Sequence, residues 1–359
     1  MKRREFLEHL PAAGGILLQG RSRKRTRPLI RHAPRGAALG PRIPRPDPYR
    51  SGDGRPRLVC IEGVDIALML RKGLAAMGGL EPLIPGRQGV LIKPNLVLRE
   101  PAGIPDYPTM SSPDTIRELI HLVRTLSDDV MVGDQGGEDQ AAIYEDLDLP
   151  NAVMGAGARL IDFEREADPV RAVRLPEWGS VGPDYHVFGT IHRASVILSL
   201  CNLKRHSSAY MTGAIKNMFG ALEGRWNSGT RGWVHRFPNY SREFIESLPD
   251  VWALIRPELT IVDARHIMVG NGPLLSSPGA EIRTGVSRLV LGADPVAVDA
   301  YCARRILAPR DPSFDPDTIS PMLSRAESLG LGTADLDAVE IREIDESWVG
   351  GSKRGPHRR

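Results

Sequence analysis

Polar side chains follow several apolar segments of this sequence, at the points where strands would end. The segment GVLIKPNLV at 89–97 carries Lys93 and Asn95, and the segment DVMVGDQGG at 129–137 carries Asp134. In open α/β sheets, ligands bind beyond the carboxyl ends of the strands, so such side chains are candidates for a binding site. Five segments end in this way, and their polar residues are Lys93, Asn95, Asp134, Asn202, Lys204, Arg205, His206, Asp263 and Asp294. We therefore expect one polar site at one edge of a sheet.

Two lysines lie in sequence contexts that favour a functional role. Lys93 is surrounded by apolar residues, and an uncompensated buried ammonium costs roughly several kcal/mol, so it must reach an acidic partner, a ligand or a cleft. Lys216 and Asn217 lie in TGAIKNMFG, where Gly213 and Gly220 enclose a short turn or helix. Backbone N–H groups at the start of such a helix can hold an anion beside a lysine.

Each candidate also has a structural interpretation. His206 can transfer protons, because an imidazole titrates near neutral pH, but a single histidine is equally often structural. An aspartate at a strand end often caps the next helix, and Asp294 before Pro295 has that pattern. Asp299, one turn later, is either an inward ligand or an exposed carboxylate. A metal site built on Cys201, His206 and Asp134 is a further alternative, although its ligand spacing is not diagnostic.

The elements that must position these residues alternate between strand-like and helix-like segments from residue 57 onward. Strands are expected at 57–63, 89–97, 129–137, 158–163, 185–191, 194–200, 258–264, 287–294 and 338–343, and helices at 64–78, 113–125, 241–255, 295–307 and 318–329. Several of the strands are apolar on both faces, as in a parallel sheet that is covered on both sides. We expect an α/β fold, a mostly parallel sheet with helices on both faces, in one large domain with a loop insertion at 224–239.

Composition restricts the classes of function. The chain has 359 residues, of which 41% are hydrophobic and 25% charged, with a net charge of +3. Residues 1–57 alone contribute +11, so the rest of the chain carries −8. Because the positive charge lies outside the folded body, we expect no nucleic-acid partner, and no segment suggests a membrane span. The three cysteines are widely spaced, so the chain has no iron–sulfur cluster motif.

The first 56 residues are expected to be a basic leader followed by a disordered linker rich in Arg and Pro, and residues 346–359 a basic tail. Arg3 and Arg4, followed by Phe6 and a small apolar stretch to Leu18, resemble a twin-arginine signal, which favours export. Pro11 and the basic run RSRKRTR at 21–27 depart from that pattern. The alternative is a basic tail on a cytoplasmic protein.

Five segments in order resemble a family of proteins from bacteria and archaea that is catalogued as domain of unknown function 362. They are GGLEPLIPGRQGVLIKPNLV, VMVGD, LCNLKRHSSAYMTGAIKNMFG, ELTIVDARHIMVGNGP and LVLGADPVAVDA, and the similarity runs from Val59 to Gly332. The family usually has lysine-threonine-histidine where this chain has Lys204, Arg205 and His206. The resemblance implies a redox-related context, since many relatives are fused to ferredoxin-type domains, and it supports the export reading.

We therefore expect an exported enzyme that acts on a small anionic substrate, with a ferredoxin-type or other redox protein as its partner and with an unknown cofactor. The catalytic candidates are His206, Asp134 and Lys93. The ligand-binding candidates are Asn95, Lys204, Lys216, Asn217, Asp263, Asp294 and Asp299. No metal ligand is assigned. The alternative is a non-catalytic envelope module that binds an anion or a metal.

Overall fold

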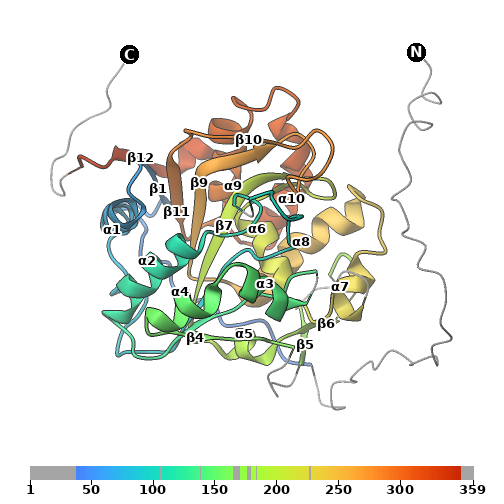
Figure 1. The fold of residues 1–359 in the computed structure, drawn as a ribbon, viewed down its shortest axis with the longest axis horizontal. Coiled ribbons are helices and arrows are strands. Elements are labelled where there is room, and N and C mark those ends of the chain that lie inside the picture. The colour runs from blue at the N-terminus through green and yellow to red at the C-terminus, as the bar shows by residue number, and fades with distance from the viewer. Residues whose placement is uncertain are drawn as a thin grey trace. The chain divides into compact units, whose positions relative to one another are not determined.

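The computed structural model describes residues 38–348, except for positions 106, 138, 165–169, 176–178, 183 and 226–227. The expected export signal and the basic residues after 348 lie outside this part of the chain. The described chain forms a single domain built around one mixed, mostly parallel sheet (Figure 1).

The main path through this sheet has the strand order β12-β1-β11-β9-β7-β2-β3-β4. Its strands are β1 (Arg57–Glu62), β2 (Val90–Lys93), β3 (Val130–Val132), β4 (Arg159–Leu160), β7 (Val196–His206), β9 (Leu259–Val269), β11 (Arg288–Gly292) and β12 (Glu340–Asp345). Every neighbouring pair on this path is parallel except the two pairs that β11 makes, with β1 and with β9. The carboxyl ends of all the path's strands other than β11 therefore point to the same edge.

Short strands extend the sheet or lie apart from it. β8 (Tyr210–Thr212) pairs with the end of β7, and β10 (Glu281–Arg283) pairs with the end of β9, both antiparallel. β5 (Arg171–Arg174) and β6 (Asp184–Val187) form a separate two-stranded sheet.

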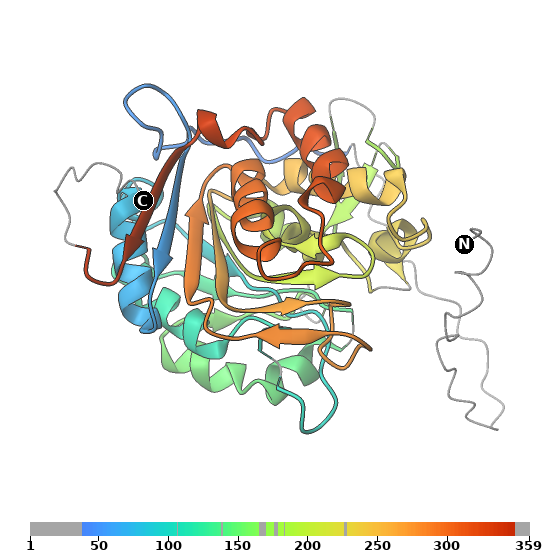
Figure 2. The same ribbon diagram turned by 90° about the horizontal axis from the view of Figure 1, so that it is seen from above.

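Helices cover both faces of the sheet, as the view from above shows (Figure 2). One face packs against α1 (Ile66–Met77), α2 (Pro113–Arg124), α3 (Gln140–Asp146) and α4 (Leu149–Gly155). The other face packs against α5 (Gly189–Arg193), α6 (Ala214–Asn217), α8 (Arg242–Ile255), α9 (Pro295–Tyr301) and α10 (Ser320–Ser328). The two faces follow from strand alternation, because Val90 and Ile92 enter the first core while Leu91 between them enters the second. The expected fold class is confirmed.

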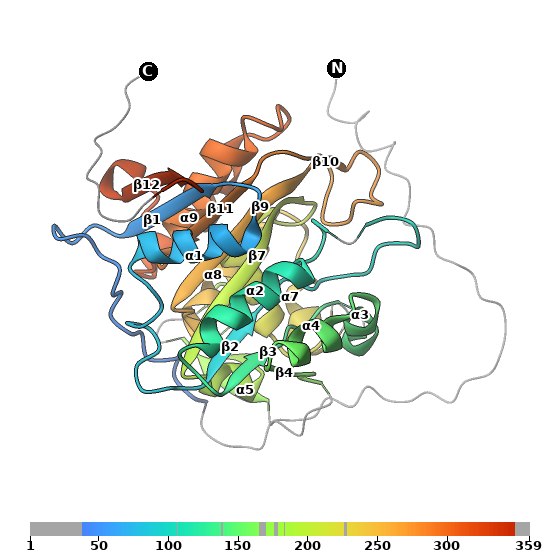
Figure 3. The same cartoon turned by 60° about the vertical axis from the view of Figure 1, so that its left-hand side comes forward.

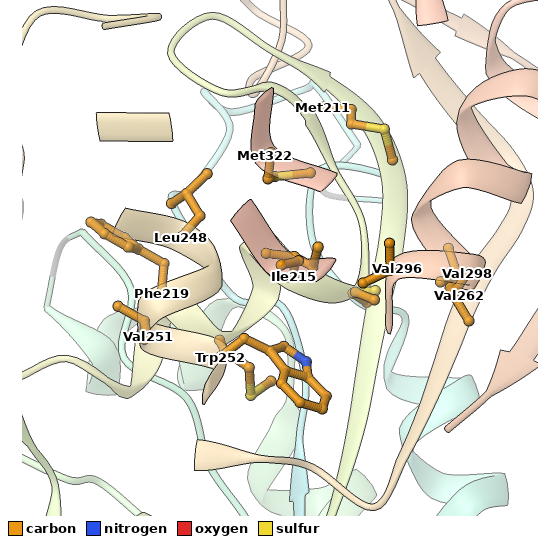
Figure 4. Packing of buried hydrophobic residues seen from close by; sticks show 14 of the residues in the cluster. Met211, Ile215, Phe219, Leu248, Val251, Trp252, Val262, Val296, Val298 and Met322 are labelled. Carbon is orange, nitrogen blue, oxygen red and sulfur yellow. The ribbon is translucent and has the colours of Figure 1, made fainter. Parts of the chain in front are cut away.

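The second core holds α6 against the sheet and thereby fixes the position of the helix that carries Lys216. Ile215 of α6 and Phe219 after it lie among Leu248, Val251 and Trp252 of α8 (Figure 4). All five side chains are almost fully buried. The segment TGAIKNMFG is thus anchored by its apolar residues, which leaves its lysine and asparagine free to face the strand ends.

Residues 38–56 pack on the domain, so the prediction of a disordered linker up to residue 56 was wrong for this segment. Arg42 is 8% exposed, and its guanidinium donates to the carbonyl oxygens of Ile255 and Ala194 at 2.6 and 2.8 Å and to Glu258 at 3.1 Å. Tyr49 is fully buried against the first core. This segment packs on the domain because an arginine and a tyrosine within it find buried partners, which its Pro-rich composition did not indicate.

Three other expectations on local structure were wrong in part. The strand expected at 185–191 ends at Val187, and α5 begins at Gly189. The strand expected at 194–200 continues to His206, because β8 and β9 pair with the polar residues beyond Leu200. The loop expected at 224–239 contains α7 (Gly229–Val234).

Among the described residues, no helix combines the length and the apolar character needed to cross a membrane.

The helices α1 and α2 pack against one another on the sheet, and Figure 3 shows them side by side.

Candidate functional site

Lys93 and Asp134 form a buried ion pair at the carboxyl ends of β2 and β3. The ammonium of Lys93 lies 2.5 Å from Oδ1 of Asp134, and neither side chain is more than 3% exposed. The backbone N–H of Leu96 donates to Oδ2 of Asp134 at 2.7 Å. Burial lowers the pKa of Lys93, while Asp134 opposes that effect. Both carboxylate oxygens are therefore engaged within the protein, and Asp134 is the counter-charge of Lys93.

Two glycines of the segment GAIKNMFG allow it to approach buried aspartates closely, Gly220 beside this pair and Gly213 beside Asp299. A Cβ atom on Gly220 would lie 2.3 Å from Oδ1 of Asp134 and 2.8 Å from Nζ of Lys93. A Cβ atom on Gly213 would lie 2.2 Å from Oδ1 of Asp299. Real Cβ atoms do not approach other atoms so closely, so a side chain at either position would displace a charged group.

Two asparagines connect the ion pair to α6. Nδ2 of Asn217 donates to Oγ of Ser199 at 3.0 Å and to the carbonyl oxygen of Lys93 at 3.3 Å. Its Oδ1 accepts a hydrogen bond from Nδ2 of Asn95 at 3.2 Å. These contacts bring together Lys93, Asn95 and Asn217, which lie up to 124 positions apart in the sequence.

Lys204 and His206 extend the site along the last residues of β7, where alternate side chains share a face. Lys204 is fully buried, and its ammonium donates to the carbonyl oxygen of Thr109. Burial lowers the pKa of Lys204 to about 7, against the influence of Glu100. Nδ1 of His206 accepts a hydrogen bond from the N–H of Ser208 at 3.1 Å. Burial, together with Lys216 and Lys204, lowers the pKa of His206 well below its usual range.

Lys216 and Arg231 both lie against the ring of Phe219. Nζ of Lys216 is 5.0 Å and Cζ of Arg231 is 5.5 Å from the ring centroid. Arg231 also donates to the carbonyl oxygens of Gln135 and Gly136, which follow Asp134. Burial, together with the charges of Arg231, Lys204 and Lys93, lowers the pKa of Lys216 to about 7. Lys216 makes no hydrogen bond or ion pair with any residue that the structure describes.

We refer to Lys93, Lys204, Lys216, Arg231 and Asp134 as the cationic cluster. Each member is at least nine-tenths buried, and among the four basic side chains only Lys93 forms an ion pair with a carboxylate of the described residues, that of Asp134. Three of the four basic residues in the cluster are lysines, although lysine is rare in this chain. Only 7 of its 47 Lys and Arg residues are lysine. Lysine differs from arginine in that burial readily brings its pKa toward neutral pH. The cluster therefore combines excess positive charge with groups that titrate near neutral pH.

Three aspartates predicted to line the site have other partners. Asp263 accepts hydrogen bonds from Tyr107 at 2.9 Å and Thr115 at 3.0 Å and pairs with Arg265 at 2.8 Å. It lies on β9 next to Asn202 of β7, at the border of the site.

Asp299 holds α6 in place. Its carboxylate accepts hydrogen bonds from the N–H groups of Ala214 and Ile215 at 2.6 and 3.0 Å, and burial raises its pKa to about 7. The amides at the start of α6, which the sequence suggested as an anion site, are thus occupied by this side chain.

Asp294 lies away from the cluster, because β11 runs antiparallel to its neighbours and ends at the opposite edge of the sheet. Its carboxylate caps α9 through the N–H groups of Val296 and Ala297 and also accepts from Thr333. The structural interpretation of Asp294 as a helix cap is correct, and its placement in the site was wrong.

Sequence reasoning missed Arg231 and His235. Both lie in the segment 224–239, which the sequence predicted as a loop insertion. His235 packs edge-on against Phe219, and burial with Lys216 and Arg231 lowers its pKa to about 3. Their position could not be read from the sequence, because α7 is too short to show an apolar period.

Within the described part of the chain, no group of three or more His, Cys, Asp or Glu side chains is arranged to hold a metal ion. Cys201 is fully buried and its pKa is raised well above the usual value by that burial, so it is a protonated thiol.

Fold and site define an α/β protein with a buried cationic cluster at the carboxyl ends of parallel strands. The chain belongs to the family described as "Domain of unknown function (DUF362)", whose model matches residues 90–304. It is 25% identical over 281 residues to the thylakoid-associated protein sll1697 of Synechocystis sp., an alignment that covers 75% of this chain and 77% of that protein.

Among solved structures, the chain is similar to the lactate racemase apoprotein from Thermoanaerobacterium thermosaccharolyticum, with 10% identity and a TM-score of 0.42. The similarity covers 72% of this chain and about 60% of the racemase chain.

Proposed function

We propose that the cationic cluster binds a small anion and that the protein is an enzyme acting on that anion. One observation carries this proposal: four buried basic side chains lie within electrostatic reach of Asp134, whose carboxylate is already paired with Lys93. Several like charges in a buried environment repel one another unless an opposite charge lies between them. A bound anion supplies that charge.

The proton-transfer role is better assigned to Lys216 or Lys204 than to His206 or Asp134. A general acid or base works best when its pKa is near the working pH, and both lysines have a pKa of about 7. His206 is neutral at that pH, and its Nδ1 accepts a backbone hydrogen bond. Asp134 is held by Lys93 and Leu96. Lys216 is the stronger candidate, because its ammonium has no other partner among the described residues.

The test is calorimetric titration of the protein with phosphate, sulfate, oxalate and acetate. Lys216→Met should abolish binding of any anion that the unchanged protein binds, because the change removes the charge and keeps most of the apolar stem. Lys72→Met is the matched control, since Lys72 lies outside the cluster and donates to carbonyl oxygens of Glu346 and Trp348. Equal anion binding by both variants would refute the proposal.

A non-catalytic binding module is the second candidate, favoured by the closure of the cluster, in which Lys216 and His206 are each only 8% exposed. Lys216→Arg separates the two functions, because arginine keeps the charge and does not release a proton near neutral pH. For an enzyme, this variant binds the anion and loses turnover, followed by NMR of the bound anion over time. For a binding module, neither protein converts the anion.

Export through the twin-arginine route and a redox partner are further parts of the proposal. Export is supported by Arg3 and Arg4 with the apolar stretch to Leu18. Replacing both arginines by lysine should keep the full chain in the cytoplasm, measured by fractionation of the producing cells. Unchanged localisation would favour the basic tail. A stable complex with a ferredoxin on gel filtration would support the redox context.

A further inference from the structure

Several polar atoms beside the cationic cluster have no hydrogen-bond partner although they are shielded from solvent. Two of them are acceptors, Oδ1 of Asn95 and Oε1 of Gln135, and one is a donor, Nε of Arg231. The three side chains are 6%, 1% and 5% exposed. Leaving a buried polar atom unpaired carries its full desolvation penalty, so such atoms in one small region indicate a group that binds there.

The acceptor character of Asn95 is fixed by its neighbours. Nδ2 of Asn217 donates to Ser199 and to the backbone, so Oδ1 of Asn217 faces Asn95 and requires a donor. Asn95 must therefore turn its Nδ2 toward Asn217, and its Oδ1 points away from that contact. The free position beside Asn95 requires a hydrogen-bond donor, whereas Lys216 and Nε of Arg231 require an acceptor.

The charges give the second requirement. Lys93 is balanced by Asp134, which leaves Lys204, Lys216 and Arg231. Glu100 lies near Lys204, and its carboxylate already accepts hydrogen bonds from Thr109 and from the N–H of Leu275. Glu164 also acts on Arg231, but it is already paired with Arg225. Lys216 and Arg231 thus form no ion pair with a carboxylate of the described residues, and the high burial of the cluster restricts their counter-ion to a compact one.

We propose that the ligand is a compact oxyanion that carries about two negative charges and at least one O–H donor, of which hydrogenphosphate is the simplest. This inference rests on the proposed function and defines its ligand further. The negative oxygens pair with Lys216 and Arg231, and the O–H group donates to Asn95 or Gln135. Sulfate has the same shape and charge but no proton, so it leaves both acceptors unpaired. The site should distinguish the two anions by this one hydrogen bond.

Calorimetric titration near pH 7, with phosphate and sulfate at equal ionic strength, tests this inference on the full chain. We expect phosphate to bind at least about tenfold more tightly than sulfate, because a missing partner for a buried polar group in a site of this kind costs about 1.4 kcal/mol or more. Equal affinities would leave anion binding in place and overturn the inference about the O–H donor. Failure of both anions to bind would overturn the hydrogenphosphate ligand as well, and would refute the proposed function if oxalate and acetate also fail.

Asn95→Leu provides the second arm of the experiment. It should reduce phosphate affinity about tenfold and leave sulfate affinity unchanged, so the discrimination disappears. Asn151→Leu, at an exposed position on α4, is the control that retains discrimination. If Asn95→Leu melts at a lower temperature, Gln135→Leu replaces it, since it removes the other unpaired acceptor. Discrimination that survives in both variants would contradict the assignment of these acceptors.

Discussion

The carboxylate of Asp134 lies between two elements that meet only in the folded protein: its Oδ1 is 2.5 Å from Nζ of Lys93, and a Cβ atom on Gly220 would lie 2.3 Å from the same oxygen. Because Lys93 ends β2 and Gly220 follows α6, one carboxylate fixes the distance between the sheet and the segment that carries Lys216. The ion pair is thus the framework of the site, and the remaining cations are arranged around it.

Asp134→Asn should destabilise the protein by about 3–5 kcal/mol, because it leaves the ammonium of Lys93 buried without a counter-charge. The measurement is the free energy of unfolding in urea. Adding Lys93→Met to the same chain should recover a large part of that loss, since the unpaired charge is then gone. The matched control is Asp128→Asn, which breaks the exposed pair with Arg87 and should change little. Equal effects of the two aspartate changes would contradict the role of Asp134.

Gly220→Ala should reduce anion binding and cost about 1–3 kcal/mol of stability, because the added methyl group overlaps both charged groups of the ion pair. Gly155→Ala is a suitable control, since no atom lies within 4 Å of a Cβ built at that position. Affinity from calorimetry and unfolding in urea would be measured on both variants. Wild-type anion affinity in Gly220→Ala would show that the close approach of Gly220 to the Lys93–Asp134 pair is not needed for binding.

The sequence predicted the fold class and most of the strand-end residues because apolar runs of strand length followed by polar residues report parallel strands directly. The sequence prediction misplaced Asp294 because an apolar run does not reveal the direction of its strand. β11 is as apolar as its neighbours β1 and β9 but runs antiparallel to both. The sequence prediction could not assign Arg231 to the cluster, since that contact depends on the tertiary packing of α7 against the residues after Asp134.

Anion affinity should fall as the pH rises above about 7. The pKa of Lys216 and of Lys204 is about 7, so both ammonium groups lose their protons above that pH, and the anion must then bind together with a proton. Each lysine contributes up to about a tenfold change in affinity per pH unit. Calorimetry with sulfate, which does not itself titrate between pH 6 and pH 9, would measure the slope over that range, and titration in two buffers with different ionisation enthalpies would report proton uptake. Affinity that does not change with pH would exclude these lysines as the ligand's partners.

The same shift predicts how the ligand-free protein responds to pH. Between about 7 and 10.5 the unfolded chain binds a proton at Lys216 that the folded chain does not, so this lysine makes stability rise with pH in that window. Lys216→Met should flatten the rise in urea unfolding experiments, whereas Lys72→Met should not. A rise of equal size in both variants would assign it to other groups.

Arg42 should anchor the segment before β1 to the amino ends of β7 and β9. Its guanidinium contacts Glu258 and the backbone of Ile255 and Ala194, all of which precede those strands. Burial raises the pKa of Glu258, and Arg42 offsets that effect, so removing the arginine leaves a buried carboxylate unpaired. Arg42→Met should therefore cost about 3–5 kcal/mol, and combining it with Glu258→Gln should cost less than Arg42→Met alone. Arg55→Met is the control, because Arg55 pairs with Asp53 at an exposed position.

A chain that begins at residue 51 should melt well below one that begins at residue 38, because the shorter chain lacks Arg42. Equal melting temperatures would show that the packed segment contributes nothing to stability.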